Sequence, residues 1–230
     1  MTRSSIARWL RRAEIALSVL GVSLLGGALA AIVNTWVYQA RQGRAFSDLE
    51  RRAAASTYGL ESPRAPASAG PFTLAPDADP LVLGRIEIPR IGVSAIVREG
   101  DDDTTLAVAV GHIPGTARPG ELGNMVLAGH RDSFFRALRH IRLHDTIRIR
   151  TAGRRYEYLV DSTEVVRAGD TRVLDPTGDA VLTLVTCYPF EYVGHAPNRF
   201  IVRASRPPMD GVSTRSSGLR WRAPVAGVSQ

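Results

Sequence analysis

The sequence predicts a mostly β domain, an eight-stranded barrel with short helices, that follows an N-terminal transmembrane helix. The 19 residues from 15 to 33 carry no charge, and at about 1.5 Å per residue such a helix can cross a hydrocarbon core of roughly 30 Å. Short runs of β-favouring residues separated by turn residues follow between positions 81 and 206. In residues 146–150 every second residue is apolar, as is typical of a half-buried strand.

The N-terminus is expected to comprise a basic cytoplasmic segment, residues 1–14, and a signal-anchor, residues 15–38. Arginines precede the apolar run, and Trp36 and Tyr38 follow it, where amphipathic rings favour the membrane interface. This pattern predicts a single-pass cell-membrane protein with an extracytoplasmic domain. Residues 28–30 (Ala-Leu-Ala) resemble a cleavage site, so a removable signal peptide is the alternative. Both interpretations export the domain that follows.

The next segments are predicted from composition. Residues 39–80 are expected to be a Pro/Ala-rich linker, because prolines lie among Ala and Ser residues there. Residues 81–206 have the size of one domain. Residues 207–230 contain few large apolar side chains and are expected to form a mobile basic tail.

Composition also excludes several classes of function. All 29 basic residues are arginines, but they are spread over tails, strands and loops without aromatic interleaving, so nucleic acid is not an expected partner. The only cysteine, Cys187, cannot form an intramolecular disulfide or the usual multi-Cys zinc site. The acidic run 101–103 matches no recognised calcium loop, so no metal or cofactor is expected.

Gly, Pro, Asp and Asn residues mark the ends of the expected strands. The strands lie near residues 81–88, 92–98, 124–129, 145–151, 154–160, 162–167, 180–187 and 199–205. Two short helical stretches interrupt them. Asp102 or Asp103 is expected to cap a turn that runs to Val108. Asp132 or Ser133 is expected to cap residues 134–138, with three apolar side chains turned inward, namely Phe134, Phe135 and Leu138.

Three residues at predicted strand ends have the chemistry of a nucleophilic cysteine site. Cys187 closes one strand, because Pro189 cannot continue it, and such a thiol needs a proton partner and an oxyanion donor. His130 ends another strand and is the preferred partner, with His195 as the competing histidine. Arg199 opens the last strand and would lie beside Cys187 if the two strands pair antiparallel. Alone, the cysteine could be an inert small hydrophobe and the arginine a solvated residue.

Three segments resemble the signature segments of the sortase family, and they occur in the same order. They are 127–132 (Leu-Ala-Gly-His-Arg-Asp), 183–187 (Thr-Leu-Val-Thr-Cys) and 196–200 (Ala-Pro-Asn-Arg-Phe). Residues 111–116 and 187–190 are similar to the class D branch. The resemblance covers the chain from about residue 81 to residue 204.

The resemblance implies a membrane-anchored cysteine transpeptidase. Cys187 would attack the C-terminal sorting signal of an exported protein, Arg199 would hold the oxyanion, and His130 would protonate the leaving amine, giving a thioester acyl-enzyme. An amine acceptor, such as a peptidoglycan stem peptide or another protein, would then resolve the thioester. Further substrate-binding candidates are Thr186, Tyr188 and Asn198.

Two other functions stay open on the sequence alone. A catalytically inactive, membrane-tethered β-barrel could act as a binding module and would form no thioester with a sorting peptide. A cysteine hydrolase would use the same acyl-enzyme and release its product to water. Only the products distinguish these functions from transpeptidation.

Overall fold

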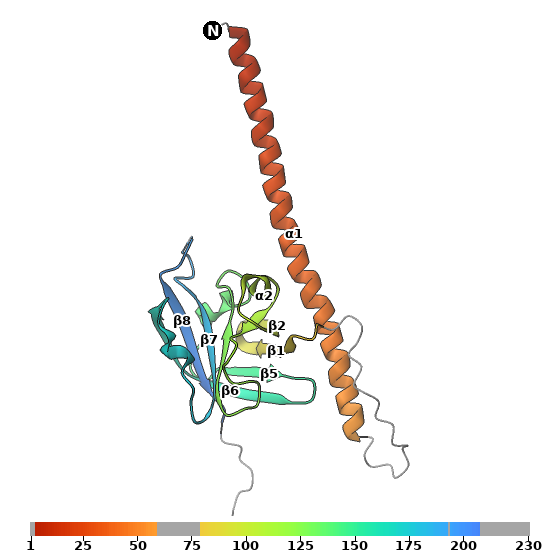
Figure 1. Cartoon of the computed structure of the whole chain (residues 1–230), viewed down its shortest axis with the longest axis vertical. Helices are drawn as coiled ribbons and strands as arrows, with labels where there is room; N and C mark the ends of the chain where they lie inside the picture. Colours follow the sequence, from red (N-terminus) through yellow and green to blue (C-terminus); the bar gives the residue numbers. More distant parts are fainter. Residues whose placement is uncertain (1–2, 59–78, 193, 208–230) are drawn as a thin grey trace, which may run out of the picture.

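The computed structural model describes residues 3–58, 79–192 and 194–207 of the chain. Its strands close into a barrel in the order β1-β2-β3-β4-β7-β8-β6-β5, with a long helix beside it (Figure 1). The elements, with η for a 3-10 helix, are α1 (Arg3–Tyr58), β1 (Val82–Ile88), η2 (Pro89–Ile91), β2 (Val93–Glu99), α2 (Asp103–Val108), β3 (Val110–His112), β4 (Gly123–Ala128), η3 (Arg136–His140), β5 (Thr146–Arg150), β6 (Arg155–Arg167), η4 (Thr171–Leu174), β7 (Ala180–Tyr188) and β8 (Asn198–Ser205).

The predicted eight-stranded barrel is confirmed, although two of its strands differ from the prediction. β6 is one strand of 13 residues, where two were expected, because it continues its pairing with β8 across an irregularity between Val160 and Ser162. β3 was not predicted, because its three residues are too few to show a period. Within the barrel, β2 pairs with β3 and β4 with β7 in parallel, and the remaining pairs are antiparallel.

One of the two short helices forms as predicted. Asp102 caps α2 by accepting hydrogen bonds from the amides of Thr104 and Thr105. The predicted cap by Asp132 or Ser133 is wrong, since no side chain caps η3. Instead, the backbone carbonyl of His130 accepts the amide of Phe135 at 3.1 Å. The inward packing is confirmed for the fully buried Phe135 and Leu138, whereas Phe134 is partly buried against the core.

Helix α1 continues to Tyr58, which corrects the prediction of an extended linker from residue 39. The prolines begin only at Pro63, and residues 39–58 are rich in the helix formers Ala and Arg. The rest of the expected linker that precedes Asp79, residues 59–78, and residues 208–230 of the expected tail lie outside the described residues. Among the helices that are described, α1 alone is long and apolar enough to cross a membrane.

The second half of α1 packs against the barrel. Ala45 and Phe46 are buried, and Gln39 joins two backbone segments with its side-chain amide. Its Nε2 donates to the carbonyl of Val108 at 2.7 Å, and its Oε1 accepts the amide of Ile96 at 3.0 Å. Because the pairing of β2 with β3 begins one residue later, at Val97, the glutamine takes the place of a strand partner.

Near its C-terminal end, α1 is held to the barrel by ion pairs. Arg150 of β5 donates to the two carboxylate oxygens of Glu50 at 3.0 and 2.6 Å, and it also reaches Glu87 of β1 at 3.1 Å. Near the middle of the helix, Tyr38 donates to Asp79 at 2.8 Å, and Asp79 also binds Arg98 of β2. The helix is therefore part of the folded unit over residues 35–50.

Replacing Gln39 with leucine is expected to leave the Ile96 amide and the Val108 carbonyl without partners, at a cost of about 1–3 kcal/mol per group. Hydrogen–deuterium exchange on the full-length protein in detergent should show the Ile96 amide exchanging roughly tenfold faster or more. Arg41→Leu, at an exposed position of the same helix, is the control and should leave this rate unchanged. Normal protection of Ile96 in Gln39→Leu would contradict the role of the glutamine.

Candidate active site

The candidate site is built on β7, which lies between β4 and β8. β4 and β7 are parallel, so their carboxyl ends lie at the same rim of the barrel. β8 is antiparallel to β7, so its first residues meet the last residues of β7. One rim of the barrel therefore brings together the residue that follows β4, the end of β7 and the start of β8.

Cys187 and Arg199 are direct cross-strand partners, as the sequence predicted. Residues directly opposite each other in an antiparallel pair have Cβ atoms about 4.5–5.5 Å apart. Leu182 and Leu184 of β7 are fully buried in the core, so by alternation Cys187 lies on the outer face of the strand. Both Cys187 and Arg199 are partly exposed there.

The guanidinium of Arg199 is only partly used by the protein. Its Nη1 donates to the carbonyls of Ala196 at 3.2 Å and Asn198 at 3.0 Å, so the side chain is tied to the β7–β8 loop. A guanidinium has five N–H donors. Within the described part of the chain neither Nη2 nor Nε makes a hydrogen bond, so their donors can serve a developing oxyanion.

His130 lies two residues beyond the end of β4, where a continued β4–β7 register would set it opposite Cys187. Each β4 residue pairs with the β7 residue 57 positions later, as Leu127 does with Leu184, and the ladder continues with a 3.1 Å bond from the Gly129 amide to the Val185 carbonyl. A Cβ on Gly129 would lie 2.8 Å from the ring of Phe135, so this residue faces the core. The next residue, His130, is partly exposed.

Thr186 does not have the exposure that a substrate contact needs. It is 2% exposed, and its hydroxyl donates to the carbonyl of Gly129 at 2.7 Å. The substrate contact expected of Thr186 stays a prediction, and in this structure its hydroxyl is bound to the backbone. The bond ties the strand that bears the cysteine to the residue that precedes His130.

The other predicted residues lie at the same rim. Tyr188 pairs with Asn198, and both are partly buried. The ring of Tyr188 packs against Phe190 at 5.9 Å and Phe200 at 6.2 Å between centroids. His195 is exposed in the β7–β8 loop, where no strand register holds it level with Cys187. The geometry therefore favours His130 as the partner of the cysteine.

Arg131 joins the histidine segment to the β7–β8 loop, a contact that the sequence analysis missed. Its Nη2 donates to the carbonyls of Tyr192 at 2.6 Å and Gly194 at 2.9 Å. Arg139, farther along the same segment, forms an ion pair with Glu191 of the loop. No spacing in the sequence signals such contacts. The segment that begins at His130 and the loop between Cys187 and Arg199 are thus joined at two points.

Comparison with known proteins begins with the sequence. Residues 86–207 match the Sortase family, described as the Sortase domain. Sortase D of Bacillus subtilis (strain 168) is 36% identical over 124 residues, which are 54% of this chain and 63% of that protein. Sortase A of Listeria monocytogenes is 29% identical over 137 residues, 57% of this chain and 61% of that protein. The chain thus spans less than two thirds of the length of these curated relatives.

Solved structures show the same architecture. A lid mutant of sortase A from Corynebacterium diphtheriae is 30% identical, with a TM-score of 0.54 over 74% of this chain and 97% of that one. Sortase C1 from Streptococcus suis is also 30% identical, with a TM-score of 0.51 over 55% of this chain and 73% of that one. A Clostridium perfringens Sortase D5 transpeptidase, at 24% identity and a TM-score of 0.54 over 73% of this chain and 98% of that one, shares the fold.

Arg131→Ala is expected to release the β7–β8 loop, because it removes both bonds to the loop carbonyls. Hydrogen bonds to charged groups contribute about 1.5–3 kcal/mol each, so cleavage of the loop by chymotrypsin at Tyr192 should accelerate roughly tenfold or more. Arg142→Ala, in the same segment but without a side-chain contact to the loop among the described residues, is the control. Equal cleavage rates of Arg131→Ala and the unmodified protein would contradict the role of Arg131 as a clamp on the β7–β8 loop.

Proposed function

The chain belongs to the sortase family, and on this premise we propose that it is a membrane-anchored cysteine transpeptidase in which Cys187, His130 and Arg199 act together. The observation that carries the proposal is the strand register at the rim. It sets the nucleophile directly opposite Arg199, and a continuation of the β4–β7 register would bring His130 to the other side of the nucleophile. These residue types supply the thiol, the proton and the oxyanion donor that acyl transfer requires.

The proposed reaction has two halves. The Cys187 thiolate attacks the scissile carbonyl of a C-terminal sorting signal, and the donors on Nη2 and Nε of Arg199 stabilise the oxyanion. His130 then protonates the leaving amine, and the adduct collapses to a thioester. An amine acceptor, such as a peptidoglycan stem peptide or another protein, gives its proton to His130 and takes the acyl group. Tyr188 and Asn198 are proposed to line the substrate groove.

The helix α1 supports a location at the cell membrane. Residues 15–38 are proposed to be the single membrane span, with the N-terminus in the cytoplasm and the barrel outside. Because α1 continues without a break into the part that packs on the barrel, the barrel would lie directly at the membrane surface. The β7–β8 loop points toward the N-terminal end of α1 (Figure 1), so the catalytic rim would face the membrane.

The thiol chemistry can be tested on the full-length protein in detergent, incubated with a peptide library and an amine. Mass spectrometry should show a thioester on Cys187 and an amide product, and Cys187→Ala should abolish both while its thermal melt stays normal. His130→Ala should slow thioester formation on the order of 10²-fold or more, because the leaving amine loses its proton donor.

The matched control for the histidine is His195→Ala, and greater damage there would show that the wrong histidine had been chosen. Free acid as the only product in the presence of amine would favour the hydrolase. No thioester with any peptide would favour the binding module.

The oxyanion role predicts that Arg199→Lys and Arg199→Ala both lose roughly 2.7–4 kcal/mol of transition-state stabilisation, mainly in kcat. Lysine keeps the charge, but an ammonium cannot bind the loop carbonyls and the oxyanion in the planar geometry of a guanidinium. Arg203→Ala, at a partly buried position four residues farther along β8, is the control and should leave kcat unchanged. Near-normal kcat in Arg199→Ala, with a normal thermal melt, would refute the role.

A further inference from the structure

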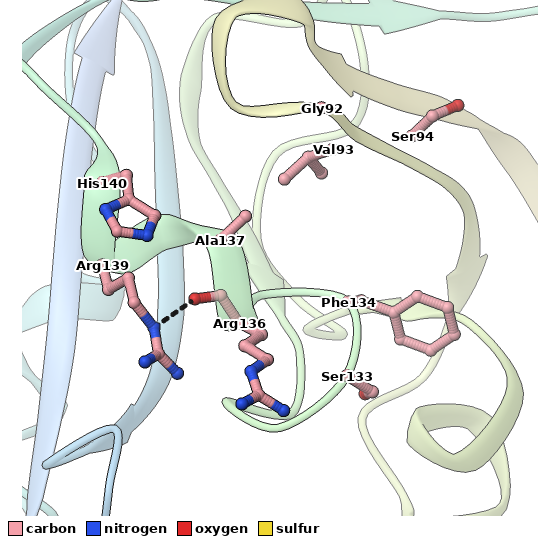
Figure 2. Close-up of a pocket in the computed structure, with 9 residues that line it drawn as sticks. All are labelled: Gly92, Val93, Ser94, Ser133, Phe134, Arg136, Ala137, Arg139 and His140. Atoms are coloured by element: carbon pink, nitrogen blue, oxygen red, sulfur yellow. Dashed lines mark hydrogen bonds between the residues drawn. The ribbon is translucent and has the colours of Figure 1, made fainter.

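A cavity of about 550 Å³ opens beside the segment that follows His130 (Figure 2). One wall is the start of β2, and the other is the turn at residues 133–135 together with η3. None of the three proposed catalytic residues lines it. The lining residues that matter here are Val93, Phe134, Arg136, Ala137, Arg139 and His140.

Positive charge and apolar surface meet in this cavity. The guanidinium groups of Arg136 and Arg139 lie on the same side of the segment in Figure 2. Arg139 is engaged by Glu191, whereas among the described residues no ion pair to the side chain of Arg136 is formed. An exposed guanidinium above apolar walls is suited to a peptide that carries a carboxylate, which guanidinium binds with two parallel hydrogen bonds.

Contacts connect the cavity to the catalytic rim. Arg139 lies over the ring of Phe190, with Cζ 5.5 Å from the centroid, and Phe190 packs edge-on against Tyr188. Tyr188 directly follows the cysteine. On the other side, Ser133 lines the cavity, and its amide donates to the carbonyl of His130 at 3.4 Å. The cavity therefore adjoins the site on the side of the histidine.

The two half-reactions place the acceptor on this side. His130 gives a proton to the leaving amine and takes one from the incoming amine, so both amines must occupy the same position beside the imidazole. In the acceptor site inferred here, the rest of the acceptor would extend along the segment that starts at His130. That segment forms one wall of the cavity.

We propose that this cavity binds the amine acceptor and that Arg136 selects acceptor peptides that carry a carboxylate. The inference rests on the proposed transpeptidase function, since only a transpeptidase needs an acceptor site. The wall of the cavity that η3 forms is held in place by Arg90. Arg90 of η2 binds both Asp145 and the carbonyl of His140, which fixes η3 against the start of β2.

Binding can be measured without the reaction, by calorimetry on the full-length protein in detergent. The probes are the peptide Ala-Glu-Lys with a free carboxyl terminus and Ala-Gln-Lys-amide, which keeps the lysine amine and loses both carboxylates. The acidic peptide is expected to bind about tenfold more tightly, because a charge-assisted hydrogen bond contributes that much. Arg136→Gln should remove this preference. Arg154→Gln is the matched control, because Arg154 is an exposed arginine in the β5–β6 turn and should keep the preference.

Equal affinity of the two peptides for the unmodified protein, or a preference retained in Arg136→Gln, would overturn the proposal. A preference lost equally in Arg154→Gln would also overturn it, since general charge attraction would then explain the result. The assay uses no sorting peptide, so it is independent of the thioester assay. Selective binding without a thioester would contradict the transpeptidase alone, and a thioester without selective binding would contradict the acceptor site alone.

Discussion

The position of β7 between a parallel and an antiparallel neighbour is the constraint on which the candidate site depends. Parallel pairing with β4 makes both strands end at one rim, and antiparallel pairing makes β8 start there. Because backbone ladders set the register, the cysteine and the arginine are held level by backbone hydrogen bonds, and the histidine follows the end of β4 at the same rim. A slip of one residue would turn Cys187 into the core. The bond from Thr186 to the carbonyl of Gly129 opposes such a slip at the rim itself.

Helix α1 extends this order beyond the barrel. An extended linker would let the barrel rotate freely above a membrane. In this structure, α1 binds the edge of β2 through Gln39 and Arg150 through Glu50, so one face of the barrel is fixed against the helix. The direction of the rim relative to the apolar segment is then a property of the fold. This is why the polar residues of α1 after position 38 matter as much as the apolar residues before it.

The residues at strand ends could be predicted because local signals mark them. Pro189 ends the strand that carries Cys187, and apolar alternation defines the strands around it. The helix beyond residue 38 was missed because residues 39–80 were interpreted as one segment, and the prolines after position 60 indicated an extended linker. The burial of Thr186 could not be predicted, since its inward direction depends on where the barrel closes. The clamp by Arg131 joins residues 61 positions apart, and no periodicity reports a contact of that kind.

The segment from Gly129 to Asp145 contains the proposed proton donor, the contact to the β7–β8 loop and one wall of the cavity. Its second residue, His130, is the proposed acid, and its Arg131 holds the loop that precedes Arg199 of β8. Its far end is fixed by Arg90, whose hydrogen bond holds the pKa of Asp145 below its usual range. A carboxylate with a lowered pKa stabilises the fold above its unfolded pKa of about 3.9, and that contribution is lost as the pH falls through the lower folded value. The support is therefore complete at neutral pH, where the proposed thiol chemistry would take place, and it holds in place the segment that carries His130 and lines the cavity.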